Sequence, residues 1–166
     1  MLMEIIGRDR ELEAITTFLD REQDGPQVLL LEGEAGIGKT TLWNQAATAA
    51  EPAHRVLRAS PREIETRISF ASIGDLLTDV VEEAADRLPG AQRRALERAL
   101  LMTDDDGPQP EPQAIAFACL SILRVLARAR PVLVAVDDIQ WLDQPSASVL
   151  VYAARRLHDE DIRFLL

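Results

Sequence analysis

Gly33-Glu-Ala-Gly-Ile-Gly-Lys39-Thr40 matches the spacing Gly-x-x-x-x-Gly-Lys-Ser/Thr of a phosphate-binding loop. The run Val28–Leu31 before it is short and apolar, which predicts a buried parallel strand. The segment Thr40–Ala50 after it predicts a helix. A strand, a glycine-rich loop and a helix in this order form the context in which the motif binds nucleotides.

The loop contains the residue types that a triphosphate needs around it. Its glycines carry no Cβ, so the backbone can turn sharply and approach the phosphates, and its N–H groups form an anion cradle with those of the helix start. Lys39 adds a positive charge near the β- and γ-phosphates and is predicted to act in catalysis, and the Thr40 hydroxyl is placed to ligate Mg²⁺. ATP and Mg²⁺ are the predicted cofactors. The predicted nucleotide contacts of the loop are Gly33, Glu34, Ala35, Gly36, Ile37, Gly38, Lys39 and Thr40.

A chance glycine-rich turn is the alternative interpretation of this motif. With about 7% Gly, and roughly 6% each for Lys, Ser and Thr, the pattern arises by chance in under about 1% of chains of this length. The flanking strand and helix reduce that fraction further, so we interpret the stretch as a nucleotide loop.

Composition limits the remaining function classes. The 166 residues suit one domain, and a net charge of −10 argues against a nucleic-acid-binding module, which usually has a basic face. The single cysteine, Cys119, permits no internal disulfide and fits a reducing cytoplasm, and its apolar neighbours predict a buried small hydrophobe. No apolar run approaches the roughly 20 residues of a membrane span, and the N-terminus does not resemble a signal peptide. We therefore expect a cytoplasmic protein without a membrane partner.

Short apolar runs alternate with helical segments along the chain, which predicts a mainly parallel α/β sheet with helices on both faces. Asp9 is a candidate cap for the first helix, and the strand 55–59 is less apolar than the others, so we expect it nearer an edge. The expected strands are 28–31, 55–59, 132–136 and 162–166. The expected helices are 9–20, 40–50, 74–88, 91–102, 113–130 and 145–157.

Two aspartates at the end of the apolar run Val132–Val136 give the second functional signal. A carboxylate at the C-terminal end of a buried strand lies where ligands bind in such sheets. Asp137 is predicted to hold Mg²⁺, usually through water, opposite Thr40. Asp138 is predicted to orient or deprotonate the attacking water, and a turn-capping role is the alternative for it.

Three stretches together resemble a known family. They are Ile6-Gly-Arg-Asp-Arg-Glu-Leu12, Gly33-Glu-Ala-Gly-Ile-Gly-Lys-Thr-Thr-Leu42 and Asp137-Asp-Ile-Gln-Trp-Leu-Asp-Gln-Pro-Ser146. They are similar to the nucleotide-binding domain of STAND-class AAA-type P-loop ATPases. The similarity is greatest to the N-terminal ATPase domain of large ATP-binding LuxR-type transcriptional regulators.

This resemblance implies several properties of the chain. The fourth strand would insert between the loop strand and the aspartate-bearing strand. Ile6, Gly7 and Arg8 would lie by the adenine and ribose, and Thr41 would reach the α-phosphate. In such proteins nucleotide binding and hydrolysis convert an autoinhibited sensor into an active oligomer, which implies self-association of the whole protein.

The sequence ends inside the expected fourth strand. We therefore expect residues 1–166 to be the N-terminal part of an AAA-type ATP-binding domain, without the lid, sensor and effector regions of the family. Such a fragment is expected to bind Mg·ATP with little turnover. Two alternatives stay open. One is a loader or mechanical AAA-type ATPase of the origin-recognition kind, and the other is a non-catalytic nucleotide-binding module.

Overall fold

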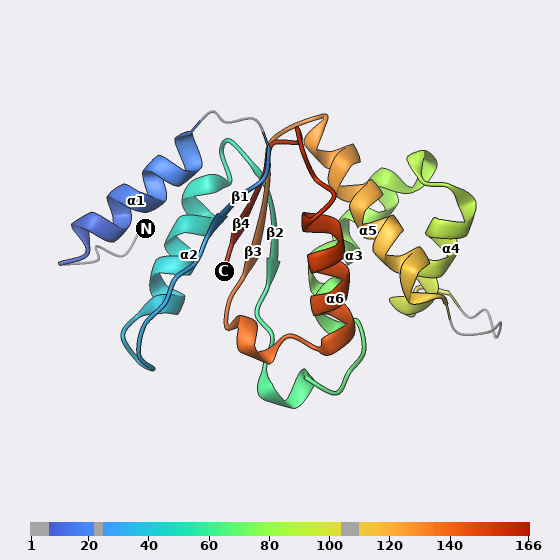
Figure 1. Cartoon of the computed structure of the whole chain (residues 1–166), viewed down its shortest axis with the longest axis horizontal. Helices are drawn as coiled ribbons and strands as arrows, with labels where there is room; N and C mark the ends of the chain where they lie inside the picture. Colours follow the sequence, from blue (N-terminus) through green and yellow to red (C-terminus); the bar gives the residue numbers. More distant parts are fainter. Residues whose placement is uncertain (1–6, 22–24, 104–109) are drawn as a thin grey trace.

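The computed structural model describes residues 7–21, 25–103 and 110–166. Its centre is a parallel four-stranded sheet with the strand order β1-β4-β3-β2 (Figure 1). The strands are β1 (Gln27–Leu29), β2 (Arg55–Ala59), β3 (Val132–Val136) and β4 (Ile162–Leu165). The predicted insertion of the fourth strand between the loop strand and the aspartate-bearing strand is therefore confirmed, as is the edge position of β2.

Helices cover both faces of this sheet, as the alternation of elements predicted. The helices are α1 (Asp9–Asp20), α2 (Lys39–Ala50), α3 (Ala71–Ala84), α4 (Gly90–Ala99), α5 (Pro112–Ala127) and α6 (Gln144–Ala154). Short 3-10 turns are η1 (Glu63–Glu65), η2 (Ala85–Arg87) and η3 (Ile139–Trp141). In Figure 1, α1 and α2 lie on one side of the sheet and α3, α5 and α6 on the other, with α4 packed outside α5.

The interior consists of two cores on opposite faces of the sheet, and the side chains of β3 point alternately into one and the other. Val132, Val134 and Val136 face the larger core, which β2 and β4 share with α3 to α6. Leu133 and Ala135 face the smaller core under α1 and α2. All five residues of β3 are buried, which explains why this strand reads as a continuous apolar run.

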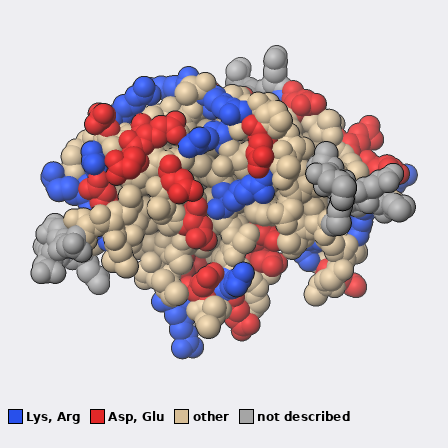
Figure 2. Space-filling model, turned by 180° about the vertical axis from the view of Figure 1, so that it is seen from behind, with Lys and Arg blue, Asp and Glu red and all other residues tan. Residues whose placement is uncertain are grey.

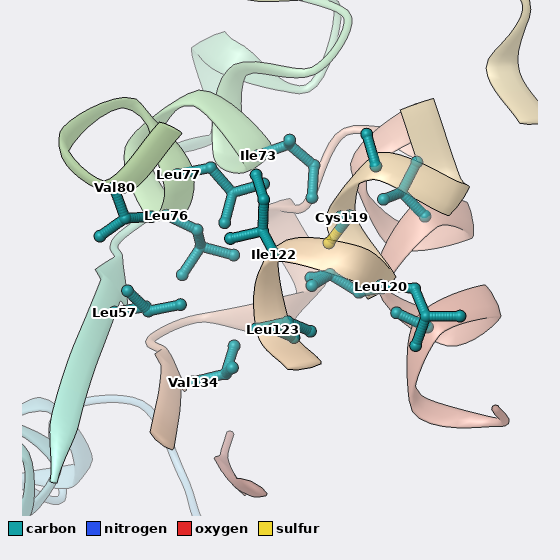
Figure 3. Close-up of a cluster of buried hydrophobic side chains, with 14 of the residues drawn as sticks. Leu57, Ile73, Leu76, Leu77, Val80, Cys119, Leu120, Ile122, Leu123 and Val134 are labelled. Carbon is teal, nitrogen blue, oxygen red and sulfur yellow. The ribbon is translucent and has the colours of Figure 1, made fainter. Parts of the chain in front are cut away.

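Interdigitated aliphatic side chains fill the larger core, shown in Figure 3. Leu57 and Val134 come from the sheet, and side chains of α3 and α5 pack above them. Cys119 lies in this cluster with a side chain that is buried, and burial raises the pKa of its thiol to about 12. The thiolate is therefore not populated near neutral pH, and the sequence-based prediction of a buried small hydrophobe is confirmed.

The strand β1 corrects one sequence-based expectation. The run Val28–Leu31 was expected to be buried, but Val28 is 63% exposed and Leu30 is 46% exposed. The reason is that side chains alternate along the strand: Leu29 and Leu31 pack against the core under α1 and α2, whereas Val28 and Leu30 belong to neither core. An apolar run alone does not distinguish an edge strand from a central one.

The start of α1 corrects a second expectation. Asp9 was the candidate cap, but it is the first helical residue, and the capping position belongs to Arg8, whose side chain makes no capping hydrogen bond. Asp9 and Glu11 instead place carboxylates in the first turn, where they stabilise the positive end of the helix dipole.

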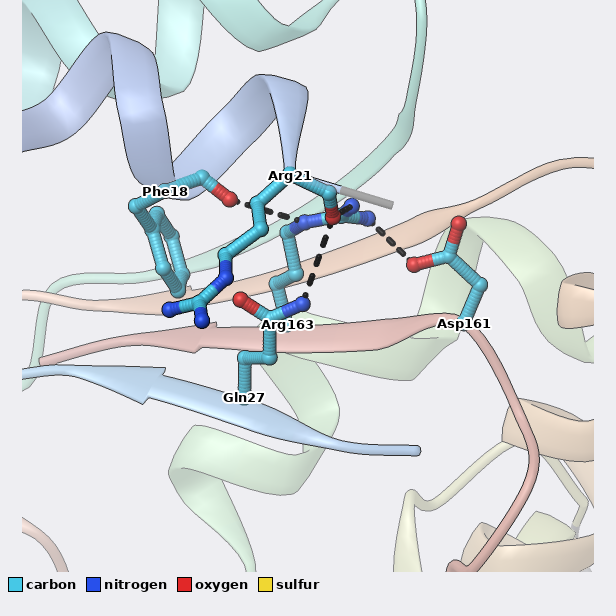
Figure 4. Close-up of polar contacts among 5 residues, drawn as sticks. All are labelled: Phe18, Arg21, Gln27, Asp161 and Arg163. Carbon is cyan, nitrogen blue, oxygen red and sulfur yellow. Dashed lines mark hydrogen bonds and ion pairs between the residues drawn. The ribbon is translucent and has the colours of Figure 1, made fainter. Parts of the chain in front are cut away.

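A buried arginine joins the end of α1 to the sheet (Figure 4). Arg163, in β4, is 3% exposed; its Nε donates to the Phe18 carbonyl at 3.0 Å and its Nη2 to the Arg21 carbonyl at 2.8 Å. Both carbonyls lie at the C-terminal end of α1, so the guanidinium donates to the end of the helix where the dipole is negative. Asp161 forms an ion pair with Arg163 and offsets the cost of burying its charge.

One face of the molecule shows how the charged side chains are distributed. Figure 2 shows acidic and basic side chains interspersed over the face turned away from the view of Figure 1. No helix in the described ranges has the length and apolar character needed to cross a bilayer.

Candidate functional site

The loop between β1 and α2 turns through two glycines in the left-handed region. Gly36 has φ +78° and Gly38 has φ +97°, a conformation that residues with a side chain rarely adopt. The Gly38 carbonyl accepts the first hydrogen bond of α2 from the Leu42 N–H at 3.2 Å. The N–H groups of the first helical turn have no acceptor in the helix, so they remain available to an anion.

Lys39 is the only lysine of the chain, and it lies over this loop. Its Nζ donates to the Gly33 carbonyl at 2.9 Å and to the Glu34 carbonyl at 3.1 Å. The loop carbonyls therefore hold the ammonium charge beside the cradle of N–H groups. Phosphate oxygens are strong acceptors that can replace these two carbonyls.

A cavity of about 890 Å³ joins the loop to the segment that follows β3. This volume lies within the range of small-molecule sites, roughly 300–1,000 Å³. Six predicted site residues do not line it: Gly7, Arg8, Glu34, Ile37, Thr41 and Asp137. The residues that line it are Leu30, Leu31, Glu32, Gly33, Ala35, Gly36, Gly38, Lys39, Thr40, Asp138, Ile139, Gln140 and Trp141.

The two predicted aspartates follow β3 directly and differ in exposure. Asp137 is buried at 9% exposure, and its N–H donates to the Ala59 carbonyl at 3.0 Å, which continues the pairing of β3 with β2. Asp138 has φ +47°, a left-handed conformation that aspartate tolerates better than most residues. Gln140 Nε2 donates to Asp138 Oδ1 at 2.8 Å and thereby orients that carboxylate.

A small hollow of about 40 Å³ brings the two halves of the site together. Lys39 and Trp43 line it from α2, and Asp137 and Asp138 line it from the end of β3. The predicted phosphate-binding lysine and both predicted acids thus lie close together at the C-terminal ends of the parallel strands. From the sequence alone, the lysine and the two acids were assigned to one site only because their motifs occur together in such proteins.

The residues present fit Mg·ATP. A Cβ built on Gly33 would lie 3.0 Å from Ile37 Cγ2, so this turn of the loop favours glycine. Lys39, the loop N–H groups and the first turn of α2 offer positive charge and donors to phosphate. No group of three or more His, Cys, Asp or Glu side chains able to hold a metal occurs within 7–21, 25–103 and 110–166. Mg²⁺ needs none, because it binds through one or two protein groups plus phosphate oxygens and water.

Comparison with known families decides the class of this domain. Residues 4–166 match the family model of the AAA ATPase domain. The chain belongs to the AAA ATPase domain family. No curated protein and no solved structure gave a match. Membership implies that this AAA ATPase domain binds ATP, in agreement with the loop, the cavity and the acid pair.

On the expected adenine side, the structure of this AAA ATPase domain covers two of three predicted residues. Ile6 lies outside the described residues. Gly7 adopts φ +78° in the turn before α1, and Arg8 Nη2 donates to the Ile37 carbonyl of the loop at 2.7 Å. The structure therefore brings Arg8 to the phosphate loop, a contact that the sequence did not predict.

Sequence reasoning also missed the contacts of two residues that follow the acid pair, Gln140 and Asp143. Gln140 orients Asp138, as described above. Asp143 is 1% exposed, and its carboxylate accepts from the N–H groups of Phe70 at 2.9 Å, Ser146 at 2.9 Å and Ser72 at 3.2 Å. An aspartate shortly before proline at the start of a predicted helix is a capping signal that could have identified Asp143.

A second cavity, of about 1,060 Å³, lies away from this site. Residues of α4, α5 and α6 line it, among them Arg98, Pro112 and Tyr152. It contains neither the glycine loop nor the two acids, so the chemistry of the lining residues favours the cavity beside the loop as the nucleotide site.

Proposed function

We propose that this AAA ATPase domain is the Mg·ATP-binding switch of a signalling ATPase. The observation that supports it most directly is the single cavity lined by Lys39, Thr40 and Asp138. A phosphate-binding loop and an acidic strand end that face one cavity are the two parts that P-loop nucleotide hydrolysis requires.

In this proposal each residue has one role. Lys39 leaves the carbonyls of its own loop and binds the β- and γ-phosphates, while the loop N–H groups hold the remaining oxygens. Thr40 and Asp137 hold Mg²⁺, which when bound neutralises charge on the phosphate oxygens. Asp138, oriented by Gln140, accepts a proton from the attacking water.

The finer class that we propose is a STAND-type ATPase domain of a LuxR-type transcriptional regulator. The support is the combination of Gly7-Arg8 before α1 with Gln140-Trp-Leu-Asp143 after the acid pair. Two contacts support this proposal: Arg8 donates to the Ile37 carbonyl of the loop, and Gln140 and Trp141 line the cavity. Self-association of the whole protein and a cytoplasmic location belong to the same proposal.

The test is a titration with a fluorescent ATP analogue, with and without Mg²⁺. Lys39→Ala should weaken binding at least about tenfold, equivalent to about 1.4 kcal/mol, because it removes the only ammonium group of the cradle. Arg128→Ala, which removes an exposed positive charge at the end of α5, is the matched control and should bind like wild type. Unchanged affinity of Lys39→Ala would disprove the phosphate-loop assignment.

The single lysine permits a second, independent test. An amine-reactive reagent can modify only Lys39 and the N-terminal amine of this chain. Mg·ATP should protect Lys39 from modification while the N-terminal amine reacts at its normal rate, as measured by mass spectrometry of peptides. Binding with protection but no hydrolysis would support the alternative of a non-catalytic nucleotide-binding module.

A further inference from the structure

Arg8 connects the start of α1 to Ile37 of the phosphate loop. Its Nη2 donates to the Ile37 carbonyl at 2.7 Å, and its Nη1 donates to Glu11 Oε1 at 2.7 Å, so both branches of the guanidinium are engaged. The Arg8 side chain is 29% exposed and that of Glu11 40% exposed. One residue therefore fixes the loop to a helix that precedes it in the sequence.

The accepting carbonyl belongs to the peptide between Ile37 and Gly38. In a planar trans peptide the C=O and the following N–H point in opposite directions. A carbonyl held toward Arg8 therefore turns the Gly38 N–H away from α1. Gly38 lines the nucleotide cavity, while Ile37 does not, which agrees with this orientation.

The Gly38 N–H is free to serve a ligand. Within 7–21, 25–103 and 110–166 it makes no hydrogen bond to the protein. Gly36 and Gly38 flank Ile37 with φ values of +78° and +97°, so the backbone on both sides has the conformational freedom to let this peptide rotate. Without a partner for its carbonyl, the peptide could place its oxygen toward the phosphates and repel them.

We infer that Arg8 is a positioning residue that holds the Ile37 carbonyl outward and thereby presents the Gly38 N–H to the bound phosphates. This inference rests on the proposed function, since it concerns how the same site receives a nucleotide. It differs from a contact of Arg8 with adenine or ribose, because it predicts an effect on any ligand that has the phosphates alone.

Two ligands distinguish a role of Arg8 in positioning the loop from a direct contact with adenine or ribose. Mg·ATP contains base, ribose and phosphates, whereas Mg·tripolyphosphate contains the phosphate chain alone. Calorimetric titration of both ligands into Arg8→Ala should show equal losses of affinity, on the order of tenfold, because a hydrogen bond from a charged donor no longer fixes the loop. Arg8→Lys, which keeps the charge but has no fork to reach both acceptors, should show a smaller loss that is again equal for both ligands.

The matched control is Arg10→Ala, which removes an exposed positive charge of the same helix. It should bind both ligands like wild type, and a loss as large as that of Arg8→Ala would show that only long-range charge matters. A loss confined to Mg·ATP would overturn the inference and assign Arg8 to the base or ribose. If wild type bound neither ligand, the proposed function would fail and this inference with it, whereas wild-type binding with an unaffected Arg8→Ala would overturn this inference alone.

A direct readout comes from the amide of Gly38 itself. The chain has eight glycines, whose ¹⁵N resonances form a separate region of the spectrum. In Arg8→Ala without ligand, the Gly38 resonance should shift or broaden, while Gly74 and Gly90, in helices on the other face of the sheet, should stay in place. An unchanged Gly38 resonance in a folded variant would contradict the positioning role.

Discussion

Gln140 Nε2 donates a 2.8 Å hydrogen bond to Asp138 Oδ1, so a neighbouring amide fixes the carboxylate that we propose as the general base. Both residues line the nucleotide cavity, and Asp138 holds a left-handed backbone conformation that begins the turn η3. The carboxylate is thus restrained from both its backbone and its side chain. Orientation of a base before its substrate binds is one way in which an active site lowers a reaction barrier.

Gln140→Ala should leave ATP affinity within about twofold and slow turnover by about tenfold, a cost of about 1.4 kcal/mol in the transition state. The reason is that the amide acts on the carboxylate and not on the phosphates. Single-turnover hydrolysis with saturating Mg·ATP measures the effect. Gln144→Ala, an exposed glutamine at the start of α6, is the control, and equal rates for both variants would contradict the role of Gln140.

The two aspartates should respond differently to loss of charge. Asp137→Asn should reduce the Mg²⁺ dependence of ATP binding, since the proposed metal contact loses its charge. Asp138→Asn should keep ATP bound and slow turnover, since it affects the attacking water alone. Binding titrations across Mg²⁺ concentrations, combined with turnover assays, measure both effects. If both variants lose binding equally while circular dichroism shows an intact fold, the division of roles is wrong.

Asp143→Ala should destabilise the domain by about 3 kcal/mol, because it leaves the buried N–H groups of Ser72 and Ser146 and the partly buried N–H of Phe70 without their acceptor. Urea denaturation measures the change. Ser148→Ala, an exposed position of the same helix whose hydroxyl bonds only its own helix, should cost well under about 1 kcal/mol. A loss below about 1 kcal/mol for Asp143→Ala would show that water replaces the carboxylate.

His54 should make stability depend on pH below neutrality. Burial lowers its pKa below the ordinary 6.5, with a further contribution from the positive charge of Arg163. Neither ring nitrogen has a hydrogen-bond partner among the described residues. As pH falls through 6.5, the unfolded chain takes up a proton that the folded chain does not, so the free energy of unfolding decreases.

His54→Gln removes this titration. The difference in unfolding free energy between wild type and His54→Gln should therefore be constant above pH 6.5 and should change in favour of the variant as pH falls below it. Urea denaturation at pH 7.5, 6.5 and 5.5 measures it, with the exposed His158→Gln as control. A difference that does not vary with pH would show that His54 is not the group responsible.

The position of β4 illustrates the limit of local sequence patterns. Ile162-Arg-Phe-Leu165 contains a charged residue, which from the sequence alone suits an exposed strand. In the structure this strand lies between β1 and β3, and Arg163 is buried against the end of α1. Two acceptors of its guanidinium, the carbonyls of Phe18 and Arg21, lie more than a hundred residues earlier in the chain, beyond any local pattern.

The sequence by itself determined the elements whose causes are local. The glycines of Gly33–Thr40 specify a sharp turn before a helix, and the apolar run Val132–Val136 specifies a buried strand ending in two acids, because sterics and side-chain alternation act over a few residues. Only the tertiary structure decided that β1 is an edge strand, that Arg8 contacts the loop and that Asp143 joins α6 to α3. These contacts depend on which distant segments the fold brings together, and no pattern within one segment contains that information.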